Sequence, residues 1–368
     1  MRILFIAPLP PPLGGHSLVA KVLYDALVNK HEVEAVNFNK NSFVEGISSF
    51  KRIFEIFSIL IKVRKGQKNA DVIYLTISES FAGNLKDIFI YLLCYNKLSV
   101  FYIHLHGGSI KRLLWDKYPL IHKINKWLIK KMSGVIITGE SHKVVFSDFV
   151  DANKIFIVPN FSLDYLFLDE KLILNKFQEL SPLRILYMSN MVEKKGYLEL
   201  AKAYISLSIE VKNKIQIDFA GRFEFDSQKN EFLQLIADFP NMQYHGMVED
   251  SQKKINLYSA AHVFALPTSF FEGQPVSILE AYASGCAVIT TGQSGILDIF
   301  TDNINGFQFN DPNSESIKKL LENIVINISD LQKIALINFN LANQKYRVSI
   351  YNKSLLDILE YQYIHLKN

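Results

Sequence analysis

The chain has few cysteines, no long apolar run and no N-terminal segment typical of export. Among its 368 residues, only Cys94 and Cys286 are cysteines. Both lie in apolar surroundings far apart in the sequence, which predicts buried free thiols in a reducing compartment rather than a disulfide framework. No run approaches the roughly 18 uninterrupted apolar residues of a membrane-spanning helix. The first eight residues are soon interrupted by prolines, unlike a signal peptide. We therefore expect a cytoplasmic protein.

The sequence also lacks a strong excess of charge and a recognisable metal or cofactor motif. The formal net charge is +4, and no nucleic-acid-binding module accompanies the basic residues, so nucleic acid is not an expected partner. No Asp-x-Asp motif occurs in a suitable context, and the glycines after the first strand do not form G-x-G-x-x-G. His104 and His106 are a pair without a third ligand at useful spacing. We expect neither a metal nor a cofactor.

What the chain does contain is an alternation of apolar, β-branched runs with longer amphipathic segments, which indicates a parallel α/β sheet. Nearly half of the residues are hydrophobic, enough for two cores. The pattern occurs once in each half of the chain, which predicts two doubly wound domains in tandem. The expected strands are 3–7, 33–37, 72–76, 99–104, 134–138 and 155–159, followed by 184–188, 215–220, 242–245, 263–266, 287–290 and 306–309.

The most informative stretch comprises residues 270–285. Gly273 lets a loop backbone approach a ligand closely, and Pro275 suits the first position of a helix. The free amides of a helix N-terminus and its dipole bind phosphate, while the carboxylates of Glu272 and Glu280 can accept hydrogen bonds from hydroxyl groups. A phosphate with hydroxyls on both sides is typical of a nucleotide sugar. The alternative is an ordinary amphipathic helix with an acidic residue near its start.

The residues from Glu272 to Gly285 resemble the hallmark of the retaining GT-B glycosyltransferases of family 4, the glycosyltransferase group 1 class. The hallmark reads E-G-x-P-x-x-x-L-E-A-x-A-x-G, and every fixed position matches. The resemblance implies an α/β GT-B fold, in which two Rossmann-like doubly wound domains face a central cleft. It implies that Glu280 holds the ribose hydroxyls and Glu272 the ring hydroxyls of the sugar. The backbone that assists them belongs to Gly273, Gln274, Pro275 and Val276.

The resemblance also implies the domain organisation. We expect an acceptor-binding domain at residues 1–165 and a nucleotide-sugar donor-binding domain at residues 166–345. The residue pattern itself places a linker at 161–182, where strand-like runs stop and Leu, Asp and Lys mix without a clear period. The resemblance implies that the C-terminal helix, at 346–368, crosses back to pack on the first domain.

Two glycine- or histidine-containing loops follow strands of the first domain. Gly14 and Gly15 precede a helix, where adjacent glycines either expose backbone amides to an anion or form a tight turn that needs positive φ. The resemblance implies that they lie over the donor diphosphate. His106 ends the fourth strand, at the edge where open α/β sheets bind ligands, and His104 shares its side of the strand. By itself, a structural histidine is the alternative; the resemblance implies that His106 contacts the transferred sugar near the reacting carbon.

The second domain has a loop similar to the family pattern G-R-x-x-x-x-K-G, whose Arg and Lys neutralise the donor diphosphate. Lys195 matches the Lys, but Asn190 stands at the Arg position and cannot pair bidentately with phosphate. Gly221 and Arg222 end the next strand and His245 the one after it, where the resemblance implies contacts with the nucleotide.

The resemblance implies a metal-independent transfer of a hexosyl unit, with retention, from a nucleoside diphosphate sugar. A UDP-sugar is favoured as the donor. Lys195, Glu272 and His106 are the expected catalytic residues. Two alternatives remain: a non-catalytic GT-B partner subunit, which Asn190 favours slightly, and a nucleotide-sugar epimerase or hydrolase.

Two segments, at 51–68 and 111–131, interleave Lys and Arg with apolar residues. Both tryptophans of the chain, Trp115 and Trp127, lie in the second segment. Such helices suit an anionic membrane surface, or they are surface helices that pack their apolar faces on the sheet. The first interpretation favours a glycan or lipid-linked glycan acceptor at the inner face of the cell membrane. The setting would be bacterial O-antigen, capsule or LPS-type polysaccharide synthesis.

Overall fold

The computed structural model describes residues 1–11, 14–39, 49–309 and 311–367. The chain divides into two compact units. The N-terminal unit comprises residues 1–160 together with 349–368, and the C-terminal unit comprises residues 161–348. Each unit is built on one six-stranded sheet in which all paired strands are parallel.

The sheet of the N-terminal unit has the strand order β2-β1-β3-β4-β5-β6. Both faces are covered by helices, so successive residues of the inner strands are buried on alternate sides, as in β1, β3 and β4. Its strands are β1 (Arg2–Ala7), β2 (Glu32–Asn37), β3 (Val72–Thr76), β4 (Phe101–Leu105), β5 (Gly134–Ile137) and β6 (Ile155–Ile157).

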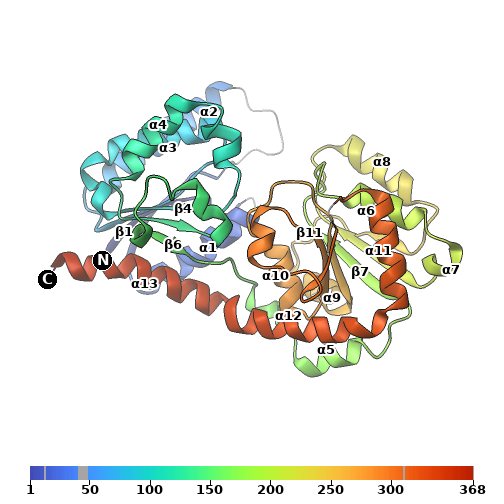
Figure 1. Ribbon diagram of the computed structural model, residues 1–368. Coiled ribbons are helices and arrows are strands. Elements are labelled where there is room, and N and C mark those ends of the chain that lie inside the picture. Colours follow the sequence, from blue (N-terminus) through green and yellow to red (C-terminus); the bar gives the residue numbers. More distant parts are fainter. Residues whose placement is uncertain (12–13, 40–48, 310, 368) are drawn as a thin grey trace. The chain divides into compact units, whose positions relative to one another are not determined.

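Two layers of helices cover this sheet (Figure 1). One face carries α1 (Gly15–Val28) and α13 (Val348–Lys367), and the other carries α2 (Ser49–Gly66), α3 (Phe81–Leu93) and α4 (Pro119–Ile129). α13 is fixed by the burial of Tyr351, Leu355 and Leu359 and by a 2.8 Å contact between Glu360 Oε1 and His31 Nε2.

The sheet of the C-terminal unit has the strand order β12-β11-β10-β7-β8-β9. The chain starts in the middle at β7, proceeds to one edge, and returns on the other side of β7 with β10. The loops after β7 and β10 therefore diverge at a topological switch point, where open α/β sheets bind ligands. The strands are β7 (Leu183–Met188), β8 (Ile215–Ala220), β9 (Met242–Tyr244), β10 (Val263–Leu266), β11 (Ala287–Thr291) and β12 (Gly306–Phe309).

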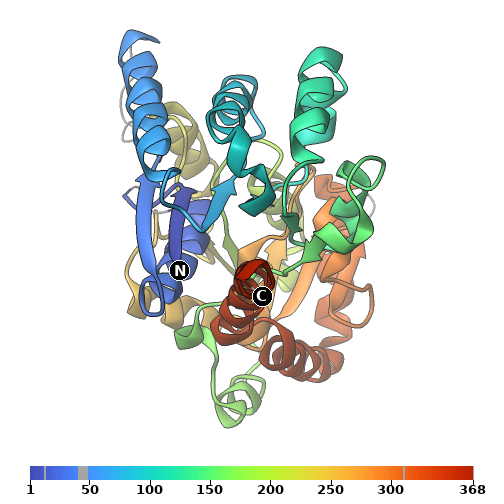
Figure 2. The same cartoon turned by 90° about the vertical axis from the view of Figure 1, so that its left-hand side faces the viewer.

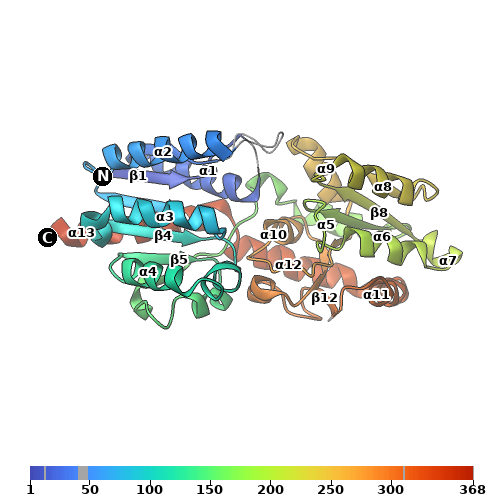
Figure 3. The ribbon, with the colours of Figure 1, turned by 90° about the horizontal axis from the view of Figure 1, so that it is seen from above.

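Helices also cover both faces of this second sheet (Figure 3). The short α7 (Ile209–Lys212) lies between α6 and β8 in the chain. One layer contains α6 (Tyr197–Ile205), α8 (Asp226–Ile236) and α11 (Ser314–Ile326), and the other contains α5 (Glu170–Lys176), α9 (Ser251–Ala260), α10 (Val276–Ala283) and α12 (Leu331–Lys345).

All twelve predicted strands are present in the described residues, with differences of one or two residues at some ends. Cys94 and Cys286 are buried and free, as expected. One local prediction was wrong: Pro275 is not the first residue of its helix but the N-cap, with φ −63° and ψ 116°. The helix begins at Val276 because the backbone of Pro275 is extended.

Candidate functional site

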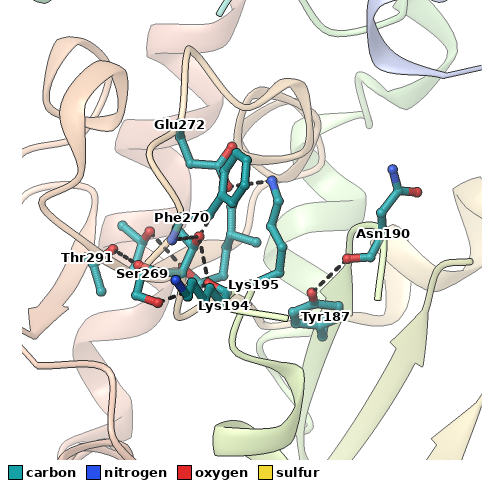
Figure 4. Close-up of polar contacts among 11 residues, drawn as sticks. Tyr187, Asn190, Lys194, Lys195, Ser269, Phe270, Glu272 and Thr291 are labelled. Atoms are coloured by element: carbon teal, nitrogen blue, oxygen red, sulfur yellow. Dashed lines mark hydrogen bonds and ion pairs between the residues drawn. The ribbon is translucent and has the colours of Figure 1, made fainter. Parts of the chain in front are cut away.

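The loop between β10 and α10 places Glu272 against Lys195 (Figure 4). Lys195 Nζ lies 2.5 Å from Glu272 Oε1, and Thr268 Oγ1 donates a 3.2 Å hydrogen bond to the same oxygen. The Lys195 side chain is 17% exposed and that of Glu272 is 8% exposed. This nearly buried ion pair joins the loops after β7 and β10, at the switch point of the sheet.

The backbone of Lys194 holds these two loops together. Its carbonyl oxygen accepts hydrogen bonds from the amides of Ser269, at 2.8 Å, and Phe270, at 3.1 Å. Gly196 then allows the loops to touch, because it has φ +85° and a Cβ added there would lie 2.0 Å from the carbonyl oxygen of Pro267. Lys195 Nζ also lies 5.1 Å from the centre of the Phe270 ring. The position of the ammonium group is thus fixed on several sides.

Glu280 lies inside α10 and is also paired with a lysine. Its side chain is 4% exposed, and Lys254 Nζ lies 2.5 Å from its Oε1. Tyr258, which is fully buried, donates a 3.0 Å hydrogen bond to its Oε2. The two glutamates of the motif are therefore each held by a different lysine, Glu272 by one after β7 and Glu280 by one on α9.

Between these glutamates, Gly273 is half-buried, Gln274 is 5% exposed, and Val276 begins α10. The first turn of a helix has backbone amides without an intrahelical partner, and its dipole favours an anion there. The loop can therefore offer amides to an anion close to two carboxylates that can bind hydroxyls.

The predicted site residues after β8 and β9 lie at the same edge of the sheet. Gly221 has φ +154°, and a Cβ there would lie 1.8 Å from the Ser189 carbonyl oxygen, so the glycine lets the loop after β8 pack on the loop after β7. Arg222 is exposed. The imidazole of His245 is held by Asp218, with 2.6 Å between Nε2 and Oδ1.

Asn190, at the position of the missing arginine, lies in the loop after β7 with an exposed side chain. Its carbonyl oxygen accepts hydrogen bonds from the Tyr187 hydroxyl, at 3.4 Å, and the Val192 amide, at 2.9 Å (Figure 4). The backbone contacts fix the loop, while the side chain adds no charge beside Lys195.

In the N-terminal unit, His104 and His106 form a close pair of tilted rings at the end of β4. Their ring centres are 3.8 Å apart, and His104 Nδ1 lies 2.7 Å from the Tyr74 hydroxyl. Burial, with a smaller effect of His16, lowers the pKa of His104 to about 3. Burial and the neighbouring His104 lower the pKa of His106 well below its usual range. Both rings are therefore neutral at physiological pH.

His106 is 5% exposed, and both of its ring nitrogens are buried without a hydrogen-bond partner. Buried polar atoms usually have partners, so the ring has unused capacity to donate one hydrogen bond and to accept another. Among the described residues, no group of three or more His, Cys, Asp or Glu is arranged to hold a metal ion.

Gly14 and Gly15 lie at the start of α1. Gly14 is the N-cap with φ −150°, and neither glycine is among the positive-φ glycines of the described chain. A Cβ on Gly15 would meet no atom within 4 Å, and one on Gly14 only the Ser17 hydroxyl at 4.0 Å. The alternative of a tight turn that needs positive φ is therefore wrong, and the glycines leave exposed backbone beside open space.

The sequence did not single out Glu79, which follows β3. Glu79 Oε1 accepts hydrogen bonds from the amides of Ser109, at 2.6 Å, and Ile110, at 2.8 Å. A Cβ on Gly107 would lie 1.9 Å from Glu79 Oε2. Glu79 thus holds the loop that follows His106, and burial raises the pKa of its carboxyl. The sequence could have indicated Glu79 by its position, because it follows β3, the strand that pairs with β4.

The two basic segments lie on one face of the N-terminal unit, where α2, α3 and α4 stand side by side (Figure 2). Trp115 is buried and stacked on His122, whereas Trp127 is 49% exposed. No helix of the described chain is long and apolar enough to cross a bilayer. The exposed large apolar side chains of this face are Ile53, Phe54, Phe57 and Ile61 of α2, Phe81, Phe89 and Leu92 of α3, and Leu113, Tyr118, Leu120 and Trp127 in and before α4.

Comparisons with known proteins agree with this geometry. Residues 171–335, which include Lys195, Glu272 and Glu280, match the family model described as glycosyl transferases group 1. Over this region the chain is therefore similar to group 1 glycosyltransferase domains.

Two curated proteins are similar to parts of the chain. An uncharacterized glycosyltransferase of Methanocaldococcus jannaschii is 22% identical over 241 residues, which cover 65% of this chain and 56% of that protein. A sucrose synthase of Melioribacter roseus is 31% identical over 100 residues, which cover 26% of this chain and 12% of that protein. The chain thus spans little more than half of the first relative and a small part of the second.

Solved structures extend the likeness to both units. Anabaena HepE in complex with UDP has a TM-score of 0.75 at 17% identity, covering 98% of this chain and 100% of that one. Sucrose-phosphate synthase from Thermosynechococcus elongatus has a TM-score of 0.72 at 13% identity, covering 100% of both chains. At these identities the likeness concerns the fold, and it confirms the GT-B prediction.

Proposed function

We propose that the chain is a retaining glycosyltransferase of family 4 that moves a hexosyl unit from a nucleoside diphosphate sugar to a glycan acceptor. The observation that best supports this proposal is the Lys195–Glu272 pair at the switch point of a group 1 glycosyltransferase domain. Glu280 is buried in the helix that follows. A UDP-sugar is the favoured donor. HepE, which shares the fold, forms complexes with UDP and with UDP-glucose, and this supports the choice.

The proposed division of labour follows the charges of the loops. Lys195 and the first-turn amides of α10 stabilise the negative charge that develops on the departing diphosphate, and they do so from fixed positions. Glu272 holds Lys195 with one oxygen and retains lone pairs for sugar hydroxyls. Glu280 accepts the ribose hydroxyls. Gly14, Gly15, Gly221, Arg222 and His245 complete the donor site in this proposal.

Retention requires the acceptor to approach the face of the sugar from which the diphosphate leaves. In the proposed step, the acceptor oxygen bonds to the anomeric carbon while the bond to the phosphate oxygen breaks, and its electron pair leaves with the phosphate. The departing phosphate takes the proton of the acceptor hydroxyl. His106, neutral and with both ring nitrogens unpartnered, contacts the transferred sugar. No metal or cofactor takes part.

We further propose a lipid-linked glycan acceptor at an anionic membrane surface. The alternative, in which the basic helices bury their apolar sides on the sheet, does not account for Phe54 at 74% exposed or Leu120 at 70% exposed. An aromatic contact joins α3 to the segment before α4, with ring centres 4.7 Å apart for Phe81 and Tyr118. The same two basic segments also carry exposed basic residues: Lys62, Arg64, Lys65, Lys123, Lys130 and Lys131. Helices that expose both apolar and basic side chains suit the boundary between headgroups and acyl chains.

Such an acceptor fits peripheral attachment to the inner face of a cell membrane and a role in O-antigen, capsule or LPS-type polysaccharide synthesis. Two other functions compete with this proposal. A non-catalytic partner subunit would bind a donor without transfer, or bind none, and Asn190 favours it. An epimerase or hydrolase would turn over the nucleotide sugar without an acceptor.

The deciding experiment is a thermal-shift panel of UDP, GDP, ADP and their common sugar conjugates, measured without added metal. A ligand at about 100 times its Kd stabilises the folded state by about 2.7 kcal/mol. Selective stabilisation by one nucleotide, lost in Lys195→Met and kept in the remote surface variant Lys214→Met, is the expected result. If no ligand of the panel raised the melting temperature, the result would contradict the proposed donor site.

A further inference from the structure

The partners of Glu280 leave it with a specific binding capacity. An ionised carboxylate has about four acceptor positions, two on each oxygen. Lys254 uses one position on Oε1, and Tyr258 uses one on Oε2. One position therefore remains on each oxygen. Two adjacent hydroxyl groups, each donating one hydrogen bond, match that remaining pair.

Lys254 and Tyr258 act on Glu280 from a single helix face. They are one turn apart on α9, so their side chains lie on the same side of that helix. Tyr258 is fully buried, and burial together with the Glu280 carboxylate raises the pKa of its hydroxyl well above the usual range. The hydroxyl stays protonated and donates to Glu280. Asp250 caps the start of α9 by accepting a 2.6 Å hydrogen bond from the Lys253 amide, which fixes the helix.

Because the Glu280 carboxylate is nearly buried, it needs Lys254 as a partner to remain charged. Glu280 is nearly buried, and a buried carboxylate without a cation is costly. With the lysine on one oxygen and the tyrosine on the other, the carboxylate plane cannot rotate freely about its last bond.

We propose that Lys254, together with Tyr258, is a positioning residue that orients the Glu280 carboxylate for two adjacent ribose hydroxyls and thereby selects ribonucleotide over 2′-deoxyribonucleotide donors. The inference rests on the proposed function, because it takes Glu280 as the ribose-binding group. It adds the groups that make Glu280 selective. An ordinary ion pair between α9 and α10 would stabilise the fold without affecting this selectivity.

The test is isothermal titration with UDP and with 2′-deoxy-UDP, or with the corresponding pair for whichever of UDP, GDP and ADP binds best. The variants are Lys254→Met, Lys254→Arg and Tyr258→Phe. Lys214→Met is the matched control, because it removes an exposed lysine–glutamate pair (Lys214–Glu210) elsewhere in the same unit.

For the wild type and Lys214→Met, we expect binding of the ribonucleotide to be about tenfold tighter or more, the value of a hydrogen bond to a charged group. In Lys254→Met the ratio should fall toward one, and in Lys254→Arg it should recover in part. Tyr258→Phe keeps the shape of the core and should also reduce the ratio. It therefore serves as the test if Lys254→Met does not fold.

Three results would overturn the inference, and they are distinguishable. If the wild type binds no nucleotide, the proposed function fails and the inference fails with it. If the wild type binds both nucleotides equally, the donor site stands but Glu280 does not read the ribose. If Lys254→Met and Tyr258→Phe bind with the wild-type ratio, Glu280 reads the ribose without help from α9.

Discussion

Lys195 Nζ lies 2.5 Å from Glu272 Oε1, although the two residues belong to loops that follow different strands, β7 and β10. In the proposed site, the pair brings the cation that would bind the diphosphate into contact with the carboxylate that would bind sugar hydroxyls. The two roles inferred separately from the sequence are therefore coupled, since each charge fixes the position of the other.

Removing either member of this pair should nearly abolish transfer. Lys195→Ala and Glu272→Ala should each lower kcat by roughly 10²–10³-fold, the usual effect of losing one preorganised electrostatic partner. Steady-state kinetics with the donor identified in the thermal-shift panel would measure this. Near-normal turnover in either variant would contradict the site.

The same pair predicts a non-additive effect on folding. Lys195→Met or Glu272→Gln leaves one nearly buried charge unpaired, which should cost about 1–3 kcal/mol in the free energy of unfolding. The double variant should lose less than the sum of the single losses, because no charge is left alone. Additive losses in urea denaturation would indicate that the two groups do not interact.

An arginine at position 190 should strengthen donor binding. Asn190 is exposed, so Asn190→Arg fits without repacking and adds a charge that can pair with phosphate. We expect roughly tenfold tighter nucleoside diphosphate binding at low salt and a smaller gain at high salt, measured by titration. Unchanged affinity at all salt concentrations would show that this position does not face the diphosphate.

Two glycine-to-alanine variants should separate binding from folding. Gly15→Ala meets open space without positive φ, so its melting temperature should stay near the wild-type value while donor affinity falls. Gly196→Ala adds a Cβ 2.0 Å from the Pro267 carbonyl oxygen at φ +85°, so it should lose about 1–3 kcal/mol of stability. If Gly15→Ala bound the donor with wild-type affinity, Gly15 would not be part of the donor site.

The buried histidine pair should make folding sensitive to acid. The pKa of His104 falls from 6.5 to about 3 on folding, so between those values the unfolded chain binds more protons than the folded one. Stability is then lost as pH falls below about 6.5. His104→Gln should lower the slope of unfolding free energy against pH in this range by up to about 1.4 kcal/mol per pH unit. An unchanged slope would mean that the ring is protonated in the folded protein.

The apolar face of α2, α3 and α4 should bind vesicles that contain anionic lipid. Phe54→Ser combined with Phe57→Ser should weaken sedimentation with such vesicles by tenfold or more, because each buried Phe contributes about 1.5–3 kcal/mol. Ile326→Ser, which changes a 78% exposed side chain of the other unit, is the control. Equal binding by all variants, or none by the wild type, would contradict a membrane surface.

The strands and the Glu272 loop could be predicted because they depend on short-range patterns. Buried parallel strands read as continuous apolar runs, and the spacing of Glu272 and Glu280 is set within one loop and one helix. Lys254 and Glu79 could not be found in this way, since each meets its partner about 26 to 31 residues away in sequence. Their pairing depends on how helices and strand ends pack. For the same reason periodicity could not tell buried Trp115 from exposed Trp127.

The placement of α13 has a consequence for synthesis on the ribosome. The N-terminal unit includes residues 349–368, of which Tyr351, Leu355 and Leu359 are buried and Glu360 meets His31, so it remains incomplete until those residues have emerged. The C-terminal unit is a single continuous segment, residues 161–348. During translation it is therefore the first of the two to have its whole sequence available, which reverses the usual order in which domains finish folding.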